Sequence, residues 1–263
     1  MHYRTQCCGT DPIKLDLEDY NLSGLISQYI RELFEDRVID EAKRLQLIEK
    51  YSQILTEAIT KGYPITSEFY DADLAKQLKE NITRFSAFKE TSFKNSIEGM
   101  LTENGKLLSF KEFKKQALEV SEDYNKRWLR TEYDQTVSSA NMANKWKSFE
   151  ANTDLYPNIR YQTVGDGRVR EKHQQWDGTV LPFDHSFWNT HLPPNDWGCR
   201  CTIMQTDAPV SKGVASGRVK KGFNTNSGKK GEIFKESPYE ETLSNAERRK
   251  AEAMADKLKK QTK

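Results

Sequence analysis

Residues 161–201 read YQTVGDGRVREKHQQWDGTVLPFDHSFWNTHLPPNDWGCRC. This stretch contains three of the four histidines of the chain, three of its five tryptophans and two of its four cysteines. It has almost no helical periodicity, and Gly-Asp-Gly, Asp-Gly and Pro-Pro turns interrupt it. So short a segment buries little aliphatic surface, and therefore a metal ion, an aromatic cluster or the helix before it must hold it in shape. We predict a compact module at residues 154–207.

Aromatic side chains are predicted to form the core of this module. One Trp or Phe buries about 150–250 Å², so four or five of them can replace an aliphatic core. The predicted core residues are Trp176, Trp188, Trp197, Phe183, Phe187, Pro193 and Pro194. Short extended runs at Val180–Leu181 and from Cys199 to Met204 predict strands between the turns.

The order of residues in this stretch resembles the signature of a known family. The matching pieces are Asp166, Arg168, Val169, Arg170 and His173, then Asp177-Gly178, Phe187-Trp188, Pro193-Pro194 and Trp197 to Cys201. Together they resemble the phage Mu F-like head morphogenesis proteins, which are minor head proteins of tailed phages. The resemblance covers about residues 125–207, including Arg130 to Tyr133 and Ala140-Asn141 on the preceding helix.

Cys199 and Cys201 are candidate metal ligands. Residues two apart in a strand face the same side, so both sulfurs would point one way and Arg200 the other. The family signature places His173 as a third ligand, and His191 or His185 is available as the fourth, which would complete a tetrahedral structural zinc site. The alternative is a pair of buried, reduced cysteines that are hydrogen-bonded or packed under Trp197.

Asp166, Arg168, Arg170 and His173 allow two interpretations. They can be a hydrolase site, with His173 as base and the arginines holding a phosphate. They can equally be structural, because an Asp in a Gly-Asp-Gly turn caps its own backbone and a neighbouring Arg pairs with its carboxylate. We favour the structural interpretation, since no nucleophile, general base and orienting group occur together in the sequence.

The rest of the chain is predicted to be helical before the module and flexible after it. Apolar residues at three- and four-residue steps predict helices from Glu18, over about 38–61, from Asp71 or Asp73, and from Ser109 with Glu112 in a capping box to about Glu150. They form an antiparallel bundle in a helical domain, residues 1–153. The fold class is therefore α+β, with a basic C-terminal tail at 208–263.

The tail carries most of the positive charge. Residues 212–263 contain 14 basic and 7 acidic residues, a net charge of +7, which leaves −5 for the rest of the chain. We predict nonspecific contacts with the phosphates of double-stranded DNA, although a solvated linker is the alternative. The predicted DNA-binding residues are Lys212, Arg218, Lys220, Lys221, Lys229 and Lys230. A charged helix capped by Ser244 is expected near the end, with Ala246, Ala253, Met254 and Leu258 as its apolar residues.

Composition excludes several classes of protein. The chain is 36% hydrophobic and 30% charged, and it contains no run of the about 18 apolar residues that a membrane span needs. No secretory leader is recognisable at the N-terminus. The cysteines form two close pairs, Cys7-Cys8 and Cys199-x-Cys201, which are not spaced like a disulfide framework. We therefore expect no membrane span and reduced or metal-bound thiols.

The resemblance implies a structural role. It implies a minor head protein of a tailed phage or prophage that acts in procapsid morphogenesis near the portal, with portal or coat protein and packaged DNA as partners. The location would be the host cytoplasm during assembly and then the interior of the virion head. The alternative is a metal-dependent hydrolase or nuclease that uses His173, Asp166 and the Cys199/Cys201 pair. A DNA-binding regulator is a third hypothesis, but no helix-turn-helix with a basic recognition helix is recognisable.

Overall fold

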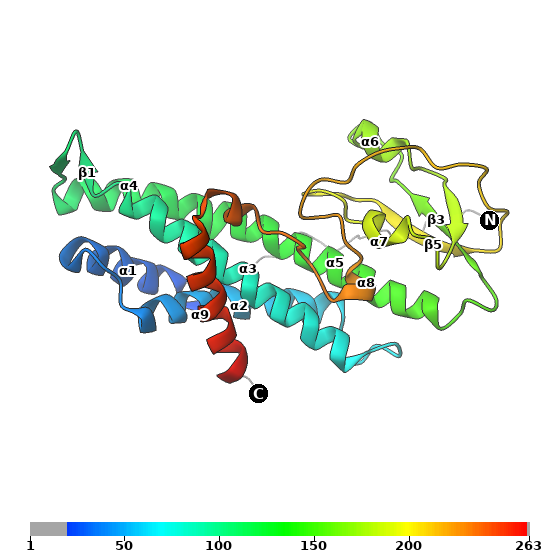
Figure 1. Ribbon diagram of the computed structural model, residues 1–263, viewed down its shortest axis with the longest axis horizontal. Coiled ribbons are helices and arrows are strands. Elements are labelled where there is room, and N and C mark those ends of the chain that lie inside the picture. The colour runs from blue at the N-terminus through cyan, green and yellow to red at the C-terminus, as the bar shows by residue number, and fades with distance from the viewer. Residues whose placement is uncertain (1–19, 262–263) are drawn as a thin grey trace. The chain divides into compact units, whose positions relative to one another are not determined.

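The computed structural model describes residues 20–261 (Figure 1). They form two compact units: unit 1 comprises residues 59–77 and 135–235, and unit 2 comprises residues 20–58, 78–134 and 236–261. Helices and small antiparallel sheets occur together, which confirms the α+β class. The N-terminal residues Glu18, Cys7 and Cys8 lie outside the described part. No helix within it combines the length and the apolar character of a membrane span.

The predicted helices before the module are present. They are α1 (Leu22–Asp36), α2 (Glu41–Gly62), α3 (Ala72–Glu98), α4 (Phe110–Glu122) and α5 (Leu129–Glu150), and a π-helical segment, η2 (Asp123–Trp128), joins α4 to α5 without a break. The helix predicted to reach Glu150 is therefore present, with a π-helical segment between its two α-helical parts. The division between the units falls within α2, α3 and α5.

The local signals that begin α3 and α4 act as predicted. The Ser109 side chain accepts a hydrogen bond from the Glu112 amide, and the Glu112 carboxylate accepts one from the Ser109 amide, which completes the capping box of α4. Asp71 accepts from the amide of Leu74 at 3.0 Å. Asn104 and Gly105 have positive φ angles in the turn between β1 (Thr102–Glu103) and β2 (Lys106–Leu107).

Unit 2 contains buried charged side chains that periodicity did not predict. Arg44 on α2 donates two hydrogen bonds of 2.7 Å to Glu90 on α3, and Tyr29 on α1 donates to the same carboxylate. Lys89 lies 3.0 Å from Glu132, which also accepts from Tyr239. Burial lowers the pKa of Lys89, although the Glu132 charge opposes this shift. Each buried charge thus has a partner of opposite sign.

Unit 1 is built on a three-stranded antiparallel sheet. Its strands are β3 (Asn158–Gln162), β4 (Val180–Pro182) and β5 (Thr202–Thr206), in the order β4-β3-β5, with Ile159 opposite Leu181 and Gln205. Two short helices, α6 (Glu171–Gln174) and α7 (Trp188–His191), lie in the connections (Figure 1). The extended run predicted from Cys199 begins later as a strand, at Thr202.

Aromatic residues fill the core of unit 1, as predicted, but the set differs. Trp176 and Trp188 are fully buried, and so is Trp146 on α5, which stacks on Phe183 with ring centroids 4.4 Å apart. Trp146 was not predicted to belong to this core. Trp197, which was predicted to belong, instead packs against Phe223 and Phe234 at 5.0 and 5.3 Å. The predicted boundary at 153 is therefore misplaced, because α5 supplies part of the core of the module.

The prediction of a flexible tail at 208–263 is wrong for its described residues. Phe223, Ile233 and Phe234 are buried in unit 1, where α8 (Ser227–Lys230) packs with Gly228 against Trp146. Unit 2 contains the 3₁₀ turn η3 (Pro238–Thr242) and α9 (Asn245–Gln261). Ser244 caps α9 as predicted, but its buried face is Ala251, Met254, Ala255 and Leu258, so Ala246 and Ala253 were misassigned.

Candidate functional site

The structure brings His173, Cys199 and Cys201 together. The His173 Nδ1 atom lies 3.5 Å from Cys199 Sγ and 3.6 Å from Cys201 Sγ. His173 is 5% exposed, and each cysteine is 8% exposed. Within residues 20–261 these three are the residues that form a cluster of possible metal ligands, with all ligand atoms inside 4.8 Å. Three of the four predicted ligands are therefore close enough to hold one ion.

Local structure explains how these side chains meet. His173 lies on α6, where its amide donates to the carbonyl of Arg170 at 2.8 Å, and its ring stacks on Trp176 with centroids 5.5 Å apart. Cys199 and Cys201 lie just before β5, so the pairing of β5 with β3 fixes their positions. Both thiols approach the same ring nitrogen while Arg200 between them is exposed, as expected for alternating residues.

The two thiols shift each other's pKa in opposite directions. A hydrogen bond with Cys201 lowers the pKa of Cys199, and a second hydrogen bond with His173 acts in the same direction. The same bond with Cys199 raises the pKa of Cys201, and burial adds to that rise. Burial raises the pKa of the neighbouring Tyr161 hydroxyl, and the negative charge at the thiols raises it further. The hydrogen bond between the two thiols therefore favours ionisation of Cys199 over Cys201.

Asp166 braces the segment that carries the thiols. Its carboxylate accepts two 2.7 Å hydrogen bonds from the Arg200 guanidinium, which is the bidentate arrangement of strong Arg–carboxylate pairs. These bonds hold the pKa of Asp166 well below its usual range. The predicted pairing of Asp166 with Arg168 is present but longer, at 3.5 Å. The sequence indicated that Arg200 faces away from the thiols but did not identify its partner.

Arg170 and Trp197 form a second brace. The Arg170 guanidinium donates to the carbonyl of Trp197 at 2.7 Å and lies 3.2 Å from Asp196. This contact joins the start of α6 to the loop before Cys199. Pro193 and Pro194, in the same loop, are buried and joined by a cis peptide bond. Trp188 is fully buried and donates to the carbonyl of Pro182 at 3.0 Å.

The predicted fourth ligand, His191, does not join the cluster. Its ring stacks on Phe187 with centroids 4.1 Å apart, and its nitrogens lie near Thr190, Phe187 and Gly217 oxygens. Burial lowers the pKa of His191. His185 is also outside the cluster, since its Nδ1 accepts from the Phe187 amide at 3.1 Å. Both histidines therefore have structural partners of their own.

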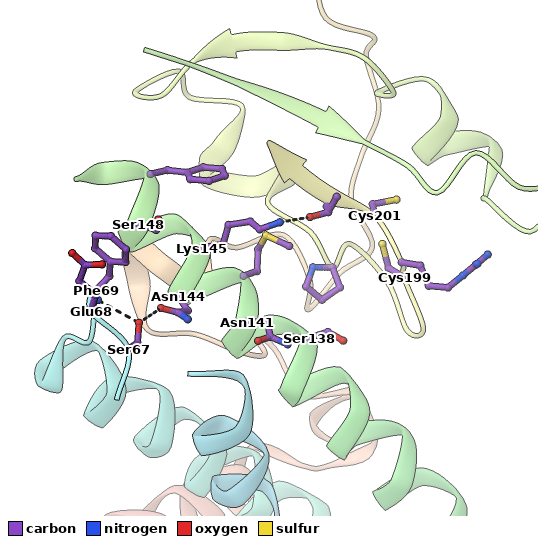
Figure 2. A pocket seen from close by; sticks show the side chains of 15 residues that line it. Ser67, Glu68, Phe69, Ser138, Asn141, Asn144, Lys145, Ser148, Cys199 and Cys201 are labelled. Carbon is purple, nitrogen blue, oxygen red and sulfur yellow. Dashed lines mark hydrogen bonds between the residues drawn. The ribbon is translucent and has the colours of Figure 1, made fainter. Parts of the chain in front are cut away.

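Two hollows of unequal size border the thiols. A small one of about 20 Å³ is lined by His173, both thiols and the side chains of Arg168, Arg170 and Arg200. A larger open groove of about 700 Å³ runs along α5, from the loop at residues 67–69 to Cys199 and Cys201 (Figure 2). Lys145, on the α5 wall of this groove, donates to the hydroxyl of Thr202 at 2.9 Å.

The alternative interpretation, a hydrolase, would need Asp166 beside His173 and the thiols. Asp166 is bound by arginines and does not join the cluster of His173 and the thiols. The small hollow that reaches His173 has room for about one water molecule, and the larger groove beside the thiols is lined by neither His173 nor Asp166. The geometry of these residues favours the structural interpretation of the signature.

All six predicted DNA-binding residues are exposed. Lys220 pairs with Asp196 at 3.0 Å, and Lys229 lies over the Trp146 ring, 5.0 Å from its centroid. Lys220 and Lys229 thus contact other residues of unit 1. The contact of all six residues with DNA stays a prediction.

Comparison with known proteins gives a family and two relatives. The family model described as "Phage Mu protein F like protein" matches residues 49–204. The putative capsid assembly protein F of Escherichia phage Mu is 37% identical over 86 residues, which cover 33% of this chain and 20% of that protein. The Mu-like prophage FluMu F protein of Haemophilus influenzae is 38% identical over 77 residues, 29% of this chain and 19% of that protein. No solved structure matches.

Proposed function

The chain belongs to the Phage Mu protein F like family, and on this premise we propose that it is a minor head protein that acts in phage head assembly. The family match over residues 49–204 carries the proposal, and the printed name of the phage Mu relative, a putative capsid assembly protein, supports it. The matched segments span about a fifth of the two relatives' length. The bracing contacts of Asp166 and Arg170 agree with a module that keeps its shape rather than turns over a substrate.

A nonsense mutation in the phage or prophage gene tests this role. We expect lysates with normal tails and few DNA-filled heads in electron micrographs, with heads restored when the wild-type gene is supplied from a plasmid. Normal heads and an unchanged titre would contradict the proposal. A missense control, Lys111→Gln on an exposed position of α4, should give normal heads.

We place the protein inside the head, near the portal, with portal or coat protein as the docking partner. Cross-linking mass spectrometry on isolated procapsids tests this placement. Cross-links from this chain to the portal protein are expected, whereas cross-links confined to the outer surface of coat protein would contradict it.

Nonspecific binding to packaged DNA is the third part of the proposal. Exposed Lys212, Arg218 and Lys230 are available to bind phosphates, and removal of each such charge should reduce the slope of log K against log salt by about 0.9. The triple Gln variant of these residues is compared with Lys111→Gln, Lys114→Gln and Lys115→Gln on α4, which removes the same charge from exposed positions. Equal slopes for the two variants would remove DNA binding from the proposal.

A nuclease assay tests the remaining alternative. Purified protein is incubated with linear DNA in the presence and absence of zinc, and the wild type is compared with His173→Ala. We expect no cleavage in any sample. Cleavage that depends on His173 would replace the structural role with a catalytic one.

A further inference from the structure

The distances in the cluster of His173, Cys199 and Cys201 match a metal site. A tetrahedral ion with Zn–S near 2.3 Å and Zn–N near 2.0–2.1 Å separates nitrogen from sulfur by about 3.5–3.6 Å. The two observed distances from His173 Nδ1 to the sulfurs are 3.5 and 3.6 Å. The imidazole nitrogen therefore stands at the separation from each sulfur that one shared ion requires, and all three ligand atoms lie within 4.8 Å of one another.

The donor set selects the kind of metal. Two thiolates and one imidazole are soft or borderline ligands, which suit zinc and disfavour magnesium and calcium. The cluster is buried, so an ion bound here would be sheltered from bulk water. Without an ion, two thiols and an imidazole would be packed together with only weak sulfur hydrogen bonds among them.

The surroundings hold the three ligands in place. Trp176 stacks on the His173 ring. Asp166 accepts hydrogen bonds from Arg200, which lies between the two cysteines, and Arg170 donates to the Trp197 carbonyl in the preceding loop. Such outer groups orient the ligands of metal sites and are part of their design. Asp166, Arg170 and Arg200 belong, with the three ligands, to the residues that resemble the family signature, whereas Trp176 does not.

A tetrahedral ion held by these three residues would need a fourth ligand. No further His, Cys, Asp or Glu of residues 20–261 joins the cluster, and His191 is engaged with Phe187. The hollow of about 20 Å³ that touches all three ligands exceeds the about 10–15 Å³ that one water molecule needs. One water molecule would therefore fit beside all three side chains.

We propose that His173, Cys199 and Cys201 bind one zinc ion whose fourth ligand is a water molecule in this hollow. The ion links α6 to the segment that leads into β5, two parts of the module that are separated by 26 residues in the sequence. Because the fourth ligand is solvent, a small ligand added from solution can replace it. The proposal does not depend on a role in head assembly.

Metal analysis of the purified full-length chain tests the site. We expect one zinc ion per chain in the wild type. Cys201→Ser and His173→Gln should each lower zinc affinity by more than the about 10- to 100-fold that removal of an outer group costs. His191→Gln and His185→Gln are matched controls, since each changes a histidine outside the cluster, and both should retain zinc.

Two further measurements keep the test decisive if a ligand variant fails to fold. Wild-type protein loaded with cobalt should show thiolate-to-cobalt charge transfer and the intense visible bands of four-coordinate cobalt, and added cyanide, a ligand of only two heavy atoms, should shift these bands by replacing water. A Cys7→Ser, Cys8→Ser variant should bind zinc normally. Wild-type protein that contains no zinc, or a Cys201→Ser variant that contains one zinc ion per chain, would overturn the proposed site. Loss of zinc from the Cys7→Ser, Cys8→Ser variant would contradict the proposal that the fourth ligand is water.

Discussion

The two units of this protein stabilise their cores in different ways. Unit 2 consists mainly of long helices and buries ion pairs, Arg44 with Glu90 and Lys89 with Glu132, together with tyrosine hydroxyls that bond the same carboxylates. Unit 1 has short strands and loops and buries three tryptophans and two thiols. The comparison teaches that long helices can bring several polar partners together at one buried point. An irregular segment is stabilised instead by a few large side chains and, as we propose, by an ion.

The largest loss of stability is expected in unit 2, when one partner of a buried ion pair is removed. Glu90→Ala would leave the buried Arg44 guanidinium without its two 2.7 Å hydrogen bonds and Tyr29 without its acceptor. Such changes cost about 3–5 kcal/mol, and we expect the upper end because two groups lose their partner. Urea denaturation followed by circular dichroism measures the loss.

Glu35→Ala is the matched control for this prediction. Glu35 pairs with Arg31 at 3.8 Å on the exposed face of α1, and exposed pairs contribute less than about 1 kcal/mol. Similar unfolding midpoints for Glu90→Ala and Glu35→Ala would show that the buried network does not stabilise unit 2.

In unit 1 the largest effect is expected from a buried tryptophan. Trp188→Ala removes a fully buried ring and its hydrogen bond to Pro182, so it should cost about 3–5 kcal/mol, near the middle of that range. Trp197→Ala is the comparison, since Trp197 is only partly buried and lies outside the main aromatic core. Tryptophan fluorescence during urea unfolding reports on both. A larger loss of stability for Trp197→Ala than for Trp188→Ala would contradict the assignment of Trp188 to the main core of unit 1.

The sequence predicted most of the helical part because its signals are local. Leu22, Ile26 and Leu33 recur at helical spacing, and all three are buried. Ser109 and Glu112 specify a helix start within four residues. The buried partners of the same helices were not predictable, because Arg44 and Glu90 are 46 residues apart and each alone resembles a surface residue.

The candidate site was only partly predictable. Spacing and the family signature selected His173, Cys199 and Cys201, which the structure brings together. The fourth ligand was misassigned to His191, because sequence proximity does not show which ring a histidine stacks on. The packing of residues 208–235 was missed for a related reason: Phe223 and Phe234 stand singly among Gly, Ser and Lys, so they produce no periodicity.

A smaller effect is expected where this segment meets the core of unit 1. A Cβ atom added at Gly228 would lie 2.4 Å from the Cβ and 2.6 Å from the Cγ of Trp146, so Gly228→Ala should cost about 1–3 kcal/mol through overpacking. Gly213→Ala is the control, because nothing lies within 4 Å of its added Cβ, and it should change stability by less than about 0.5 kcal/mol. Equal urea midpoints for the two variants would restore the interpretation of a loose tail.

The smallest of these effects is expected at the start of α4 in unit 2. Ser109→Ala removes the acceptor for the Glu112 amide and leaves one of the first backbone amides of the helix without its cap, which costs about 1 kcal/mol. Ser109→Asn preserves an oxygen in the capping position and should retain nearly the full stability. Hydrogen exchange of the amides in the first turn of α4 separates the two variants more sharply than global unfolding, since the effect is local. Faster exchange in both variants alike would mean that packing of Phe113 in the core, rather than the cap, fixes where this helix begins.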